Sequence, residues 1–151
     1  MAGKYSEAEV LSKSLKGALE AVEGKGSERT LLARKIYASS LLSLKREKLG
    51  EKAQQEVVES STFAFGENHV KTLRERLNYA GLLRNVGKVG EAEQETREVE
   101  IKAKEQLGLS HKITREARFM NGYEMCLLKR TEEGIPKMAA VIMEIERATP
   151  R

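Results

Sequence analysis

The chain has 151 residues, enough for one domain with a sizeable core. Its longest apolar run, residues 138–143, is far shorter than the roughly 20 residues of a membrane-spanning helix. The net charge of +4 comes from 27 basic and 23 acidic residues. Such a small excess argues against nucleic-acid binding and fits a mild preference for acidic partners. A single cysteine excludes an intrachain disulfide, and the N-terminus lacks an apolar signal segment, so a reducing, cytoplasmic location is expected.

The sequence repeats with a period of 42 residues. Gly24, Gly66 and Gly108 share this spacing, and six further columns keep it without a gap. These columns are Thr30, Thr72 and Thr114; Arg34, Arg76 and Arg118; Ala38, Ala80 and Gly122; Leu41, Leu83 and Met125; Ala8, Gly50 and Ala92; and Leu15, Val57 and Val99. A small and a large apolar residue three apart lie on one helical face, where the small one lets a neighbouring helix approach. The pattern predicts an all-α fold, a right-handed α-solenoid of antiparallel helix pairs.

Seven helices are predicted in chain order, at about 4–23, 28–46, 48–65, 69–86, 88–107, 111–130 and 135–148. Ser27 is expected to cap the second helix, with Thr30 at its third position. The glycine column is expected to close helices in a left-handed conformation, and Pro136 to lie in the first turn of the last helix. The first helix and three repeats, about 24–65, 66–107 and 108–148, are expected to form a single domain over residues 1–151.

The second repeat carries the string GENHVKTL at 66–73, then NYA at 78–80 and GKVGEAE at 87–93. These strings resemble the 42-residue tetratricopeptide repeats of the kinesin light chain type, which read G-x-x-H-x-x-T-L, L-N-N-L-A-x-L-Y and G-K-Y-x-E-A-E. GKYSEAE at 3–9 also matches, and the resemblance covers about residues 3–130. HEAT repeats have a similar length but do not explain the first string. The chain starts on what would be the second helix of a unit, which leaves open a piece of a longer array or a capping helix.

The resemblance implies that the first helix of each unit lines a concave groove for peptides. The groove positions are Lys35 and Ser39 in the first unit, Arg74, Asn78, Arg84 and Asn85 in the second, and Glu116 and Tyr123 in the third. Arginine holds carboxylates bidentately, asparagine bonds an extended backbone, and tyrosine offers an apolar anchor. We therefore expect an extended, acidic peptide with at least one large apolar side chain.

The arginine column, Arg34, Arg76 and Arg118, has two interpretations. Each side chain either buries its stem between helices and pairs with a glutamate of the next helix, or the three form a ladder for an acidic ligand. We favour the structural role, because the column matches a packing position of the resembled family.

No catalytic residue, metal site or cofactor is expected. His69 and His111 occupy one repeat position, so a turn role is favoured over metal ligation. Cys126 stands between two apolar residues and is expected to be a buried or half-buried small side chain. The glutamates at 91, 93, 95, 98 and 100 are interleaved with basic residues, with pairing such as that of Glu98 with Lys102. They are expected on a solvated face, with no carboxylate pair in an apolar setting.

The leading functional hypothesis is a non-catalytic scaffold for a protein or peptide partner. The alternative is a structural module that self-assembles into homo-oligomers through exposed end helices. RNA binding by helical repeats ranks third. Lys35, Leu77 and Phe119 share one repeat position, and these residue types do not form a set that recognises bases. An enzyme is the least favoured class.

Overall fold

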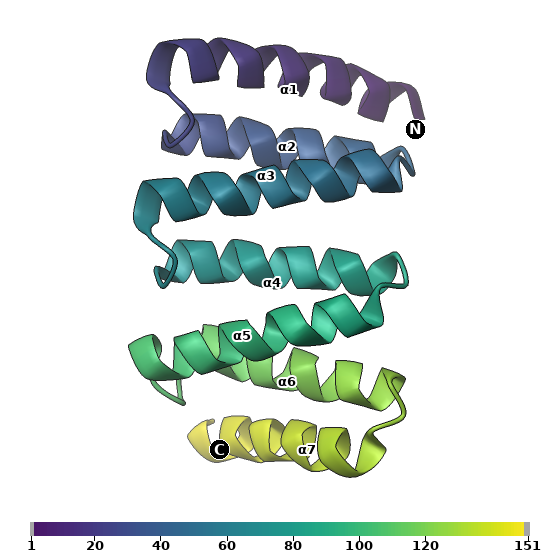
Figure 1. Cartoon of the computed structure of the whole chain (residues 1–151), viewed down its shortest axis with the longest axis vertical. Helices are drawn as coiled ribbons and strands as arrows, with labels where there is room; N and C mark the ends of the chain where they lie inside the picture. Colours follow the sequence, from purple (N-terminus) through teal and green to yellow (C-terminus); the bar gives the residue numbers. More distant parts are fainter. Residues whose placement is uncertain (1, 150–151) are drawn as a thin grey trace. The chain divides into compact units, whose positions relative to one another are not determined.

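A computed structural model describes residues 2–149, and over this range it contains seven helices and no strand (Figure 1). The helices are α1 (Ala2–Glu23), α2 (Glu28–Ser43), α3 (Glu47–Phe65), α4 (Val70–Asn85), α5 (Val89–Leu107), α6 (Lys112–Leu127) and α7 (Thr131–Ala148). The all-α class and the number of helices are as predicted, whereas the handedness of a solenoid stays a prediction.

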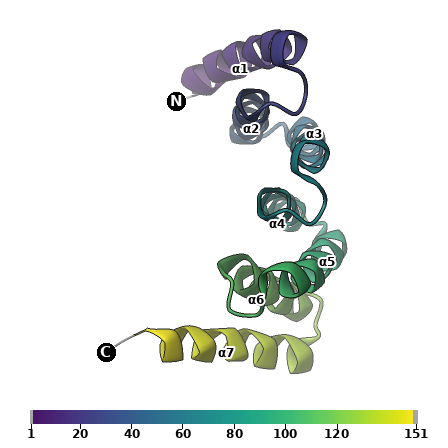
Figure 2. The same cartoon turned by 90° about the vertical axis from the view of Figure 1, so that its left-hand side faces the viewer.

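The chain divides into two compact units, and the division falls inside α4, between Glu75 and Arg76. In the first unit α2 packs against both α1 and α3, and in the second α6 packs against both α5 and α7. Neighbouring helices within a unit are antiparallel, and Figure 2 views several of them nearly end-on. Each unit therefore buries the apolar stripe of its middle helix between two neighbours.

The repeat columns form the cores of both units. The threonine column is fully buried, and so are Ala38 and Ala80. The equivalent large residues, Leu41 and Leu83, are no more than 2% exposed. Leu15 is the exception in its column at 48% exposed, because α1 packs within its unit against α2 alone. The shared face that the sequence predicted is thus the packing face of the helices.

Side-chain caps begin three of the helices. The Ser27 hydroxyl accepts a hydrogen bond from the Thr30 N–H at 3.0 Å, as predicted for the start of α2. Nδ1 of His111 accepts one from the Ile113 N–H at 3.2 Å, and Nδ1 of His69 accepts one from the Lys71 N–H at the same distance. The histidine column therefore has the turn role expected of it, satisfying backbone donors that have no partner inside the helix.

The glycine column ends helices, but not in the left-handed helical conformation that was predicted. Gly66 has φ +91° and ψ 159°, and Gly108 has φ +81° and ψ 167°. These angles lie in an extended region at positive φ that is essentially reserved for glycine. The backbone therefore turns sharply away from α3 and α5 instead of winding one more residue.

The predicted ends of α2 and α6 are wrong by three residues. α2 ends at Ser43 instead of residue 46, and α6 ends at Leu127 instead of residue 130. Lys45 and Lys129 adopt positive φ, and Arg46 N–H donates to the Leu41 carbonyl in a Schellman-type closure. Gly87 makes the equivalent turn after α4, so lysine replaces the usual glycine and hides the signal in the sequence.

The predicted start of α7 is also wrong, because the helix begins at Thr131 instead of residue 135. Pro136 is consequently its sixth residue and lies inside the helix, not in its first turn. The early start brings Gly134 onto α6, where a methyl group added to it would lie 2.3 Å from the Gly122 carbonyl oxygen. The two glycines allow the beginning of α7 to lie close against α6.

Candidate binding surface

The predicted groove positions of the first unit lie on α2 and at the start of α4. Lys35 is partly exposed, and its Nζ lies 2.7 Å from a carboxylate oxygen of Glu75. Ser39 is exposed, and Arg74 is half-buried. The Lys35 ammonium is thus already paired within the unit, so an acidic ligand would have to share it with Glu75.

In the second unit the structure brings together two of the predicted groove residues, Arg84 and Tyr123. The Arg84 guanidinium lies over the Tyr123 ring, 5.5 Å from its centre, in a cation–π contact, and the ring is 44% exposed. Asn78 and Asn85 are exposed on α4, whereas Glu116 is half-buried on α6. Arg84 and Tyr123 make an exposed aromatic group with a fixed cation beside it.

Arg84 is held in place by a buried acid. Its Nη1 lies 3.3 Å from Oε1 of Glu124, and the Glu124 side chain has no exposed surface. The other carboxylate oxygen of Glu124 accepts a hydrogen bond from the Thr96 hydroxyl at 2.6 Å. Burial raises the pKa of Glu124, the hydrogen bond from Thr96 and the charge of Arg84 oppose that rise, and the charge of Glu93 adds to it.

Glu93 belongs to the same buried polar network. Asn121 Nδ2 donates to the Glu93 backbone carbonyl at 3.1 Å and lies within hydrogen-bonding distance of the Thr96 hydroxyl at 3.2 Å. The Asn121 amide oxygen accepts from Lys137 Nζ at 2.6 Å. Glu93 is buried instead of solvated, so the prediction of a solvated acidic face is wrong at this position. The network links α5, α6 and α7 through polar groups that satisfy one another.

The sequence carried a signal for this network that was missed. Asn121 stands where the two preceding repeats have Tyr37 and Tyr79, and Glu124 stands where the second repeat has Leu82. Two polar replacements three residues apart fall on one helical face. A polar pair on a packing face predicts a buried network, because an apolar face would otherwise leave the two side chains without partners.

The arginine column is paired with glutamates, and Arg34 and Arg76 are buried while Arg118 is half-buried. Arg34 lies 2.5 Å from Glu20 on the preceding helix and 3.6 Å from Glu56 on the next one, and Arg118 donates to both carboxylate oxygens of Glu144 at 2.9 and 2.8 Å. Arg76 donates to Glu95 and Glu98 on α5. Burial by itself lowers the pKa of Arg76, but the hydrogen bonds to these two acids raise it overall, and that from Arg76 lowers the pKa of Glu98. The pairs with the next helix are those of the structural interpretation, the Arg34–Glu20 pair with the preceding helix was not predicted, and the ligand ladder stays a hypothesis.

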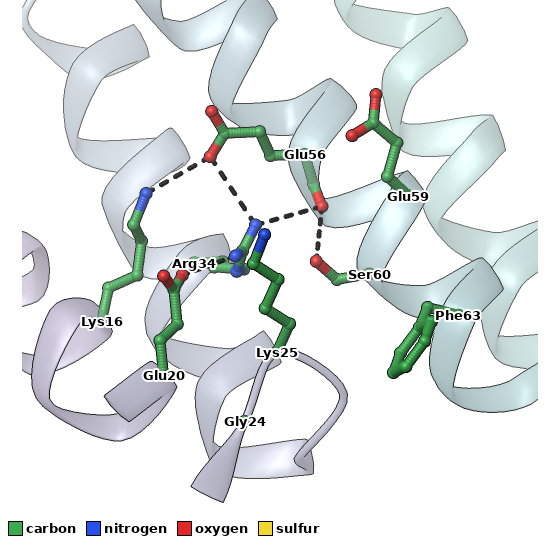
Figure 3. Close-up of a pocket in the computed structure, with 9 residues that line it drawn as sticks. All are labelled: Lys16, Glu20, Gly24, Lys25, Arg34, Glu56, Glu59, Ser60 and Phe63. Atoms are coloured by element: carbon green, nitrogen blue, oxygen red, sulfur yellow. Dashed lines mark hydrogen bonds and ion pairs between the residues drawn. The ribbon is translucent and has the colours of Figure 1, made fainter. Parts of the chain in front are cut away.

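A pocket of about 740 Å³ lies in the first unit, between α1 and α3 and above Arg34 of α2 (Figure 3). It is lined by Lys16, Glu20, Gly24, Lys25, Arg34, Glu56, Glu59, Ser60 and Phe63. None of the eight predicted groove residues takes part in the lining, whereas Arg34 of the arginine column does. Sequence reasoning did not foresee this pocket.

Cys126 is half-buried with a free thiol, as expected for a small packing residue. Within residues 2–149 no cluster of three or more histidine, cysteine, aspartate or glutamate side chains has the arrangement of a metal site. No helix in the described part of the chain is long and apolar enough to cross a membrane. Comparison with known proteins finds no matching family model and no matching curated protein.

Proposed function

We propose that this chain is a non-catalytic protein-interaction scaffold of the tetratricopeptide type, acting in the cytoplasm. Its ligand is an extended, acidic peptide segment that carries a large apolar side chain. The observation that carries the proposal is the pair formed by Arg84 and Tyr123, an exposed ring beside a cation that the buried Glu124 anchors. An anchored cation loses little conformational entropy when it meets a carboxylate, which favours binding.

The resemblance of the second repeat to kinesin light chain repeats supports the same proposal, because that family binds peptides on the first helices of its units. Asn78 and Asn85 lie on such a helix, α4, and are exposed. An amide side chain both donates and accepts, so it suits the backbone of an extended peptide. In this proposal the aromatic ring receives the apolar side chain and the amides align the segment.

Tyr123→Ala is expected to weaken partner binding about tenfold or more, because exposed aromatic anchors typically contribute 2 kcal/mol or so to an interface. The partner would be identified by pull-down with mass spectrometry and then titrated as a purified ligand by calorimetry. Leu109→Ala is the matched control, since it removes another exposed apolar side chain, one in the turn before α6. A Tyr123→Ala variant that stays folded and binds as tightly as the parent would overturn the proposal.

The second candidate is self-assembly, which is favoured by exposed apolar stripes on α1 and α7. On α1 the stripe contains Leu11, Leu15 and Val22, spaced four and seven residues apart. On α7 it contains Ile135, Ile142 and Ile145. Contiguous apolar residues on one face of a helix tend to bury themselves against a partner.

Self-assembly predicts that the sedimentation mass of the chain rises with concentration. Leu11→Glu is then expected to shift the assembly towards monomer, because it places a charge in the stripe of α1. Lys13→Glu, at another exposed position of α1, is the control and should leave the mass unchanged. A mass that stays monomeric over the whole concentration range would eliminate this candidate.

A further inference from the structure

The pocket between α1 and α3 exists because one residue is small. Its wall contains Ser60, and the same repeat position holds Lys102 and Glu144 in the following units. The Ser60 hydroxyl is turned back into its own helix, where it donates to the Glu56 carbonyl at 2.8 Å. The first unit therefore has open space where later repeats place a long charged side chain.

The second unit indicates which chemical group fits the space beside the column arginine. Glu144, the equivalent of Ser60, brings its carboxylate to within 2.9 Å of Arg118, the equivalent of Arg34. A carboxylate at this repeat position can thus reach the column arginine, as it does in the third repeat. In the first unit this position carries no carboxylate, and Arg34 pairs with Glu20 at 2.5 Å and Glu56 at 3.6 Å instead. The buried Nε–H of Arg34 has no hydrogen-bond partner among the described residues.

Several of the charged side chains around the pocket are already paired with one another. Arg34 lies 2.5 Å from Glu20 and 3.6 Å from Glu56, and Lys16 lies 3.3 Å from Glu56, so both acids are paired within the protein. Lys25 projects from the turn after α1 into the same space (Figure 3). It makes no ion pair within residues 2–149, and it adds a second cation to the lining that contains Arg34.

Phe63 completes the pocket with an apolar surface that packing does not explain. Its side chain is 81% exposed, and its ring rests on the backbone turn at Gly26, where an added methyl group would lie 3.2 Å from the ring. The same repeat position holds Glu105 and Arg147 in the later units, so the fold itself does not require an aromatic residue there. Phe63 therefore offers a ring face to a ligand.

We propose that this pocket binds a carboxylate that carries an adjacent apolar group. The carboxylate lies over Ser60, in the place that Glu144 fills in the second unit, and meets Arg34 and Lys25. The apolar group stacks on the exposed ring of Phe63. Glu59 weakens binding of this ligand, because its carboxylate also lines the pocket and repels a second negative charge. This site is separate from the groove positions of the proposed function.

The first experiment follows amide chemical shifts of Gly24, Lys25 and Phe63 by NMR while 3-phenylpropionate is added to the full chain, up to about 10 mM, the weak range expected of so small a ligand. The neutral 3-phenylpropionamide and the cationic phenylethylamine are the charge controls. Saturating shifts with the acid, and about tenfold weaker ones with the two controls, support the proposal. No shift with the acid, or equal shifts with all three, would overturn it.

A carboxylate with an adjacent apolar group can belong to a small organic acid, or to a peptide in which an acidic residue stands beside an apolar one. Titration with N-acetyl-Gly-Asp-Phe-Gly-amide separates them. Tighter binding of this peptide than of 3-phenylpropionate assigns the site to a peptide, and tighter binding of the free acid assigns it to a small molecule. If neither probe shifts the pocket amides, the site does not exist.

Two substitutions are expected to change the affinity for 3-phenylpropionate in opposite directions. Lys25→Gln should weaken 3-phenylpropionate binding about five- to tenfold, the effect of losing one charge-assisted hydrogen bond. Glu59→Gln should tighten it by about twofold, because a repelling charge is removed. Lys52→Gln, at an exposed position of α3 outside the pocket, is the control for net charge and should have no effect.

Ser60→Glu tests the equivalence with Glu144 directly. The new carboxylate should pair with Arg34 from within the chain and abolish binding of 3-phenylpropionate. Circular dichroism reports whether this variant folds. If it does not fold, the affinity of the Lys25→Gln variant for 3-phenylpropionate decides the test. A folded Ser60→Glu variant that binds the acid unchanged, or a Lys25→Gln variant with parental affinity, contradicts the proposal.

Discussion

Gly134→Ala is expected to lower the stability of the second unit by about 3 kcal/mol, towards the upper end of overpacking costs. The added methyl group would lie 2.3 Å from the Gly122 carbonyl oxygen and 2.6 Å from the Cys126 sulfur. One of these atoms belongs to the backbone, so α6 and α7 must move apart to make room. The loss should appear in chemical unfolding followed by circular dichroism.

Gly17→Ala is the matched control for that substitution. Gly17 also lies inside a helix, but an added methyl group would meet nothing within 4 Å. Alanine is intrinsically the better helix former, so this variant should gain about 0.5–1 kcal/mol. If both variants changed stability in the same direction, the close contact between α6 and α7 would be refuted.

Thr96→Val is expected to cost about 2–3 kcal/mol at neutral pH. Valine keeps the shape of threonine but leaves the buried Glu124 carboxylate without the hydroxyl that donates to it at 2.6 Å. A hydrogen bond to a charged, fully buried acceptor is among the stronger kinds, and its loss leaves a desolvated charge. Urea unfolding of the two proteins at pH 7 measures the difference.

The pH dependence of this network has a definite sign. The pKa of Glu124 is raised in the folded state, chiefly by burial, above its ordinary value of 4.5. Its stabilising contribution is therefore complete below about pH 4.5 and is lost as the pH rises through the folded-state pKa. Removing the Thr96 hydroxyl raises that pKa further, so the cost of Thr96→Val should be largest at neutral pH and shrink on acidification.

Thr62→Val provides the comparison for the network. The Thr62 hydroxyl donates only to the Val58 carbonyl of its own helix, at 2.9 Å, and contacts no buried acid. Its replacement should change stability by less than about 0.5 kcal/mol and should show no pH dependence. Equal costs for the two valine variants, or a Thr96→Val cost that grows on acidification, would exclude the role assigned to Glu124.

The sequence determined the helices and the packing face by itself, because both are encoded locally. A period of 42 residues returns the same small, threonine and apolar positions to the same side of each helix, and Thr30, Thr72 and Thr114 are all buried there. Caps are local too, so Ser27 could be assigned to the start of α2. The helix ends at Ser43 and Leu127 were missed because lysine, not glycine, takes the positive-φ position that closes them.

The candidate sites were decided by tertiary contacts, and here local pattern was insufficient. The repeat register predicts Arg84 and Tyr123 as groove positions. Only the fold, however, places the Arg84 guanidinium over the Tyr123 ring and pairs it with Glu124. The α1–α3 pocket was invisible in the sequence because it depends on a residue that is absent, a long side chain at Ser60. Burial and pairing of charges are properties of the space between helices, and that space is set by which elements pack together, not by the order of residues along one of them.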